Sequence, residues 1–156
     1  MTYRKLDGVE RNSRWTHQPQ PDQGLSALIG QSLVRVGQAY GGLQNNDFIR
    51  FDTDQGVSYV LTHIQDCCEL VSVEDITGDL QDLVGSEIVM AEVASNQTID
   101  EKYDHSTTWT FYKFATGKGF VTIRFRGESN GYYSQRVSVF ELDRPEAESN
   151  YPLPEV

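Results

Sequence analysis

The chain has 156 residues, a common size for one domain, and 38% of them are hydrophobic, so it can bury a core without a disulfide or a metal. Its net charge of −10 argues against general binding of nucleic acid or of an anionic membrane, both of which need a basic face. No apolar run approaches the ~20 residues that cross a membrane.

The composition along the chain divides it into three parts. Residues 1–23 lack apolar periodicity and a hydrophobic leader, and they are expected to form a flexible N-terminal arm. Residues 24–142 are expected to form a single β-rich domain, and residues 143–156 an acidic, proline-containing tail.

Strand patterns dominate the middle part, which predicts an α+β fold of mostly antiparallel strands and hairpins. Two hairpins are indicated by β-rich runs around the turns at 53–56 and 116–119. The other expected strands are 33–40, 70–76, 87–93 and 132–142, and the expected helical turns are 25–29 and 80–84.

The order of these elements occurs twice. Leu25 to Val34 resembles Leu80 to Val89, because each is an apolar turn, a glycine stop and a strand. Each is followed by a hairpin with a Thr-x-x-Gly turn, a polar connection and a Val-Ser-Val strand. We therefore expect a duplicated unit with pseudo-two-fold symmetry, although such short motifs also recur by chance.

The two cysteines, Cys67 and Cys68, are adjacent, and a disulfide between neighbours staples no loop. They are therefore interpreted as free thiols in a reducing compartment, which predicts a cytoplasmic protein.

Several motifs together resemble a family of small uncharacterised proteins from phages and prophages. They are Asp66-Cys67-Cys68-Glu69, Glu74-Asp75-Ile76 with Gly78-Asp79-Leu80, Thr108 to Lys113, and Ser129 to Ser134. The resemblance covers roughly residues 25–140 and implies an accessory role in phage biology and, by analogy, action against bacterial defence in the host cytoplasm. It supplies no catalytic residues.

The candidate ligand site is built from the two polar connections and a neighbouring strand. Arg124 and Arg126 share one face of a strand just before an Asn-Gly turn, so both could reach one anion. The predicted ligand-binding residues are Arg124, Arg126, Asn130, Tyr132, Tyr133, Asp66 and Glu69. The simpler interpretation is that nearby aromatic residues form core and that the arginines pair with the segment 51–101, which has acids but no Lys or Arg.

These patterns favour a non-enzymatic protein, without a cofactor, that binds a small anionic, nucleotide-like ligand or a host protein. A homo-oligomer is left open. One alternative is a metal-dependent hydrolase centred on His63 and Glu69, with His63, Asp66, Cys67 and Glu69 as ligands. The other is an acidic mimic of nucleic acid that blocks a DNA-binding protein.

Overall fold

The computed structural model describes residues 3–5, 24–130 and 132–155. The elements, in chain order, are β1 (Tyr3–Lys5), η1 (Leu25–Leu28), β2 (Leu33–Gly41), β3 (Asn46–Thr53), β4 (Val57–His63), β5 (Leu70–Thr77), η2 (Leu80–Leu83), β6 (Met90–Asp100), β7 (His105–Thr116), β8 (Gly119–Ser129), β9 (Val137–Asp143) and α1 (Arg144–Asn150), where η marks a short 3-10 helix.

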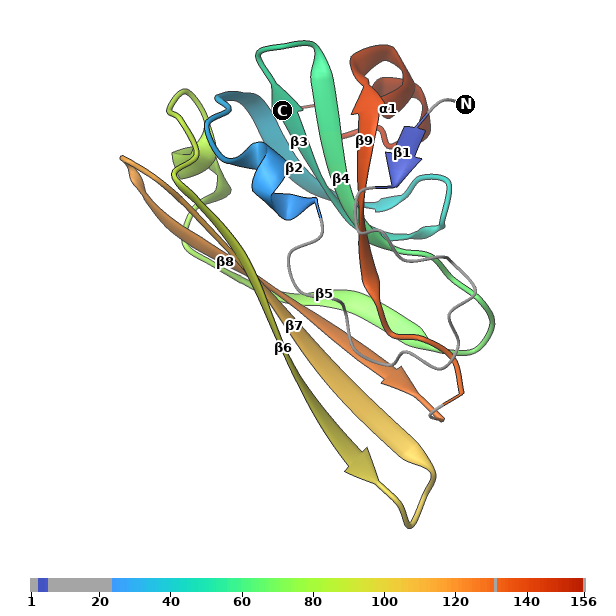
Figure 1. The fold of residues 1–156 in the computed structure, drawn as a ribbon. Coiled ribbons are helices and arrows are strands. Elements are labelled where there is room, and N and C mark those ends of the chain that lie inside the picture. The colour runs from blue at the N-terminus through green and yellow to red at the C-terminus, as the bar shows by residue number, and fades with distance from the viewer. Residues whose placement is uncertain (1–2, 6–23, 131, 156) are drawn as a thin grey trace.

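The strands form two antiparallel sheets that pack face to face (Figure 1). The first sheet has the order β1-β9-β4-β3-β2 and the second has β5-β8-β7-β6. Apolar side chains from both sheets and from the two 3-10 helices fill the space between them, and the rings of Phe51 and Phe114 meet there with centroids 5.1 Å apart. This confirms the expected β-dominated fold with two short helical turns.

The predicted repeat is present in the order and pairing of the elements. Residues 25–77 contain a 3-10 helix and four strands (η1, β2 to β5), and residues 80–143 contain the same series (η2, β6 to β9). The last strand of each series joins the other sheet, since β5 pairs with β8 and β9 pairs with β4. The two units therefore exchange their final strands, which local sequence patterns did not indicate.

Hydrogen bonds at equivalent positions support the pseudo-symmetry. Gly30 N–H donates to the carbonyl of Ile88 at 2.8 Å, and Gly85 N–H donates to that of Leu33 at 2.9 Å. Both glycines have a positive φ, 88° and 84°, which an L side chain rarely adopts and which explains glycine at the end of each 3-10 helix.

The Val-Ser-Val triplets lie on equivalent strands but in different register. Val137, the first valine of its triplet, is opposite His63 on β4. On β8 the position equivalent to His63 is Phe125, and the residue opposite it is Val73, the last valine of its triplet. Relative to its partner strand, the second triplet therefore lies two residues further toward the C-terminus than the first. In addition, the pairing of β5 with β8 has a register shift between Val73 and Asp75.

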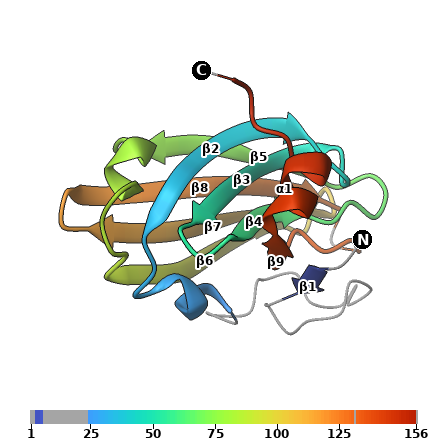
Figure 2. The same cartoon turned by 90° about the horizontal axis from the view of Figure 1, so that it is seen from above.

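The C-terminal segment, expected as an acidic, proline-containing tail, packs on the outer face of the first sheet (Figure 2). Pro145 lies in the first turn of α1, where a missing N–H costs nothing. Ala147 and Tyr151 are buried against Phe48 and Val60. Figure 1 shows no element over the outer face of the second sheet in the described part of the chain.

The expected N-terminal arm is only partly described. Tyr3–Lys5 form β1, which pairs with β9, whereas residues 6–23 lie outside the described residues. None of the helices in the described ranges combines the length and apolar character that a membrane crossing requires.

Candidate functional site

Both polar connections lie at one end of the sandwich, which we call the crossing end because the chain passes there from one sheet to the other. Residues 64–69 connect β4 to β5, and residues 130–136 connect β8 to β9. His63 is opposite Val137, and Leu70 is opposite Glu128, so the ends of the two connections are neighbours. The tip of the β6–β7 hairpin lies at the same end, because Ser106 is opposite Ser129.

Glu69 organises the first connection from inside. Its carboxylate accepts the backbone N–H of Asp66 at 2.9 Å and that of Cys67 at 2.8 Å. His63 Nε2 lies 2.8 Å from the same carboxylate, and Nδ1 lies 2.5 Å from the carbonyl oxygen of Arg136. Both ring nitrogens thus lie close to oxygen atoms, and His63 links the two connections.

These contacts change the pKa of the Glu69 carboxyl. Burial raises it, but the hydrogen bonds from His63 and from the backbone N–H groups of Cys67 and Asp66 lower it more, to about 2. Glu69 is 1% exposed and His63 is 2% exposed. A substrate therefore does not reach this pair, and its hydrogen-bonding capacity is used to hold the connections together.

The interpretation of Cys67 and Cys68 as free thiols is wrong in this structure. The two residues form a disulfide, with Cα atoms 3.7 Å apart. The prediction rested on the strain that a disulfide between neighbouring residues requires and on its closing no loop. Residues 64–69 form an irregular bend, and the disulfide places both sulfur atoms on the same side of it.

The alternative metal ligands are not arranged around a common point. Cys67 is bonded to Cys68, and Glu69 is bonded to His63 and to backbone N–H groups. Over residues 3–5, 24–130 and 132–155, no three His, Cys, Asp or Glu side chains are grouped to hold a metal ion. This geometry does not favour the hydrolase centred on His63 and Glu69.

The second connection is not the simple hairpin turn that Asn-Gly suggested, because it crosses to the other sheet. Asn130 Oδ1 accepts the backbone N–H of Tyr132 at 3.0 Å, while Gly131 lies outside the described residues. Tyr132 and Tyr133 begin the strand that was expected over residues 132–142. They lie outside any strand, and their rings pack edge to face with centroids 4.9 Å apart.

Gln135 belongs to this region and was missed in the sequence. It is 1% exposed, and its Nε2 donates to Ser106 Oγ at 2.6 Å and to Ser129 Oγ at 3.1 Å. Its Oε1 is buried and has no hydrogen-bond partner among the described residues. Glutamine in a polar stretch gives no sequence signal for burial, so only the fold reveals this role.

Gly127 makes room for Gln135, which leads to a stability prediction. A Cβ on Gly127 would lie 2.7 Å from Gln135 Cβ, so Gly127→Ala must displace Gln135 and its hydrogen bonds. We expect the variant to lose about 2 kcal/mol of unfolding free energy in urea denaturation. Gly117→Ala is the control, because nothing lies within 4 Å of its Cβ, and a change within about 0.5 kcal/mol is expected there. Equal losses in the two variants would contradict this packing.

Arg124 and Arg126 lie on the outer face of the second sheet, as the alternation predicted. Arg124 is directly opposite Phe111 on β7, and Arg126 is opposite Trp109. We call these four residues the aromatic–arginine face. Tyr112, Phe114 and Phe125 point the other way and are buried in the core.

Acidic side chains hold both guanidinium groups in place. Glu74 contacts Arg124 at 2.9 Å and Arg126 at 3.5 Å, and Glu128 contacts Arg126 at 2.7 Å. Glu74 belongs to the acid-only segment, so the predicted pairing of the arginines with that segment is confirmed. The arginine side chains keep 36% and 41% exposure, so solvent still reaches them.

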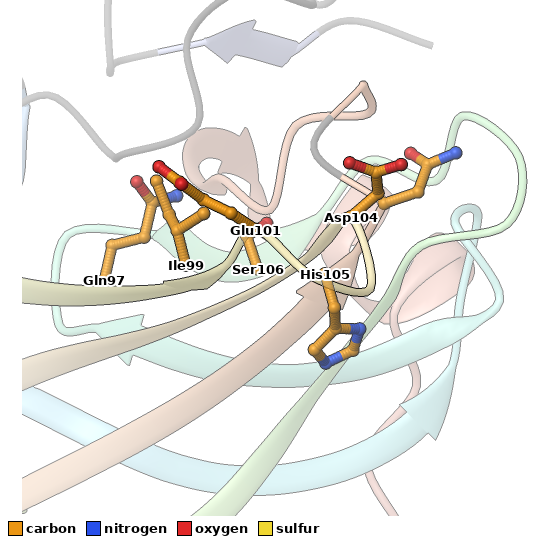
Figure 3. Close-up of a pocket in the computed structure, with 7 residues that line it drawn as sticks. Gln97, Ile99, Glu101, Asp104, His105 and Ser106 are labelled. Carbon is orange, nitrogen blue, oxygen red and sulfur yellow. The ribbon is translucent and has the colours of Figure 1, made fainter.

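A cavity of about 260 Å³ lies between the β6–β7 hairpin and the second connection (Figure 3). It is lined by Gln97, Ile99, Glu101, Asp104, His105, Ser106 and Asn130. In Figure 3 Gln97, Ile99 and Glu101 point to one side of the hairpin, whereas His105 points to the other. His105 Nε2 is 3.7 Å from Glu128, so the cavity borders the end of the aromatic–arginine face.

The predicted site residues therefore separate into three groups. Arg124 and Arg126 lie on the open sheet face, whereas Asn130, which lines the cavity, belongs with Tyr132 and Tyr133 to the second connection. Glu69 is buried beneath the first connection, with Asp66 half-buried beside it. The crossing end brings the connections together, but it does not place all seven side chains around one ligand position.

Fold and site define a small two-sheet β protein built from two similar units, with its polar connections gathered at one end. Residues 26–139 match a domain of unknown function, DUF7448. The chain belongs to this family, and the match begins in η1 and ends within β9, so it includes neither the residues before η1 nor α1. No curated protein and no solved structure matches the chain.

Proposed function

We propose that this chain is a non-enzymatic binding protein that takes a small anionic, nucleotide-like ligand on its aromatic–arginine face. The observation that carries the proposal is the contrast between the outer faces of the two sheets. The C-terminal segment covers the first, whereas no described element covers Trp109, Phe111 and the arginines on the second.

The chemistry of this face suits a base joined to a phosphate. Trp109 and Phe111 supply flat rings on which a base can stack. Each guanidinium group carries five N–H donors, more than its carboxylate contacts use, and an incoming phosphate can accept those that remain. The carboxylates of Glu74 and Glu128 fix the orientation of the arginines before the ligand arrives.

The neighbouring cavity is a poorer site for an anion. Glu101 and Asp104 contribute carboxylates to its wall, and like charge disfavours a phosphate there. The hydrolase alternative has the weakness that His63 and Glu69 are buried. The acidic mimic, a host-protein partner and a homo-oligomer stay predictions, as do the phage origin and the action against bacterial defence that the resemblance implies.

The proposal is tested by the fluorescence of Trp109. The chain has two tryptophans, so Trp15→Phe leaves Trp109 as the only one. Titration with adenosine 5′-monophosphate is expected to quench its emission in a saturable way. Arg126→Ala in the same background should weaken binding at least tenfold, because one charged partner of the phosphate is lost, while the melting temperature stays within a few degrees.

Lys102→Ala is the matched control, since it removes the same charge from the exposed hairpin tip. It should leave the affinity within a factor of two. Equal weakening by both substitutions would mean attraction by overall charge only. Absence of saturable quenching with purine and pyrimidine monophosphates would refute nucleotide binding on this face.

A further inference from the structure

The two cysteines form an unusual feature on the surface of the crossing end. Cys67 and Cys68 are the only cysteines of the chain, and both are exposed in the structure. Their disulfide closes a ring between neighbouring residues and joins no distant segments. Such a bond contributes little to the stability of the fold, because it restricts almost none of the unfolded chain.

Hydrogen bonds, and not only the disulfide, fix the backbone around the two cysteines. Glu69 holds the N–H groups of Asp66 and Cys67, and Gln65 Nε2 donates to the carbonyl oxygens of Cys67 at 3.2 Å and of Glu69 at 2.5 Å. Glu69 is in turn held by His63 on β4. None of these hydrogen bonds involves a sulfur atom, so each can persist when the disulfide is reduced.

We propose that Cys67 and Cys68 form a reversible thiol–disulfide site whose reduced form captures a soft, thiol-seeking trivalent centre such as an organic arsenical. Two molecules of a small thiol, RSH, reduce the pair, which gives two cysteine thiols and one RSSR. The two thiols of the fixed bend then point the same way and act as one bidentate ligand. An arsine oxide, R–As=O, reacts with both thiols to form two As–S bonds and one water molecule.

This inference does not depend on the proposed nucleotide site. It uses the exposure of the two cysteine residues and the hydrogen bonds that hold their bend, whereas the aromatic–arginine face uses the outer surface of β7 and β8. Failure of one proposal therefore leaves the other standing.

The first experiment is intact-mass analysis of the whole chain. Protein prepared without reductant and unfolded in iodoacetamide is expected to take up no carbamidomethyl group. After treatment with a trialkylphosphine, which becomes the phosphine oxide as it reduces the disulfide, the protein should take up two. Two groups on the unreduced protein would show that the disulfide does not form and would overturn the proposal.

The second experiment measures capture of phenylarsine oxide by the reduced, folded protein. We expect a one-to-one adduct that survives excess monothiol and is released by a dithiol. Cys68→Ser should bind at least 100-fold more weakly, since a single As–S bond is readily exchanged. Equal binding by Cys68→Ser would contradict bidentate capture.

The fixed bend is tested with Gln65→Ala and Glu69→Gln, each compared with a synthetic peptide of residues 64–70. The affinity of each variant for phenylarsine oxide should fall at least threefold, toward the affinity of the peptide. Gln65→Ala alone provides the test if Glu69→Gln does not fold. A peptide that binds as tightly as the folded protein would show that the bend contributes nothing and would overturn the preorganised site.

Discussion

Acidification from pH 4.5 to pH 2 is expected to remove about 3 kcal/mol of stability through Glu69 alone. The pKa of this carboxyl is about 2 in the folded protein, against an ordinary value of 4.5. A carboxyl with a lowered folded pKa stabilises the fold fully above its unfolded pKa, and the contribution disappears as the pH falls through the folded pKa. The measurement is urea denaturation at a series of pH values.

Glu69→Gln isolates this contribution from that of other carboxyl groups, including Asp52. At pH 7 the variant should lose about 3 kcal/mol, because the charged acceptor of His63 and of two N–H groups is gone. Its stability should then depend less on pH between 4.5 and 2 than that of the unaltered protein. Glu74→Gln is the control, since its carboxylate also contacts two cations but is 33% exposed, and a loss below about 1 kcal/mol is expected. Parallel pH profiles for the unaltered protein and Glu69→Gln would contradict the assignment.

Arg50→Met is expected to lower the unfolding free energy by about 3–5 kcal/mol, the usual cost of breaking a buried ion pair. Arg50 is fully buried and binds both carboxylate oxygens of Asp52, at 2.9 and 2.8 Å. It also donates to the carbonyl of Tyr151 at 2.9 Å, which ties β3 to the segment after α1. The substitution removes this hydrogen bond to Tyr151, and among the contacts described it leaves Asp52 with Ser58 and Arg144. Urea denaturation at pH 7 measures this loss of unfolding free energy.

Arg35→Met provides the comparison. Arg35 also donates to a carbonyl of the C-terminal segment, that of Pro154, but it is partly exposed and has no carboxylate partner among the contacts described. A loss below about 1 kcal/mol is expected. If the two variants lost similar amounts, the buried pair would not be what anchors the C-terminal segment.

Local chemistry was enough to predict many of the elements but not their partners. The glycines at 30 and 85 ended the 3-10 helices as expected, and the two Thr-x-x-Gly turns formed hairpins. Asp79 caps the second 3-10 helix, since its Oδ1 accepts the N–H of Gln81 at 2.9 Å. The exchange of β5 and β9 depends on pairing between distant parts of the chain, which the periodicity of a single segment does not indicate.

The errors have identifiable causes. β6 was expected to end at residue 93 but continues to Asp100, because its polar second half lies at a sheet edge and needs no apolar alternation. The prolines of residues 143–156 led to the expectation of a tail and gave no sign of α1, although proline is also favoured in the first turn of a helix, where Pro145 lies. Of the candidate site, the shared face of Arg124 and Arg126 followed from alternation, whereas the buried pair of His63 and Glu69 required the fold.

The exchange of final strands also constrains how the chain can fold during synthesis. When the first unit has left the ribosome, β4 can pair with β3 but still lacks its second neighbour, because β9 begins only at Val137. β5 likewise has no partner until β8 has been made. Each half-finished sheet presents an open edge to other nascent chains, which favours aggregation. The two sheets are therefore completed almost together and late, which makes the protein a single folding unit despite its repeated plan.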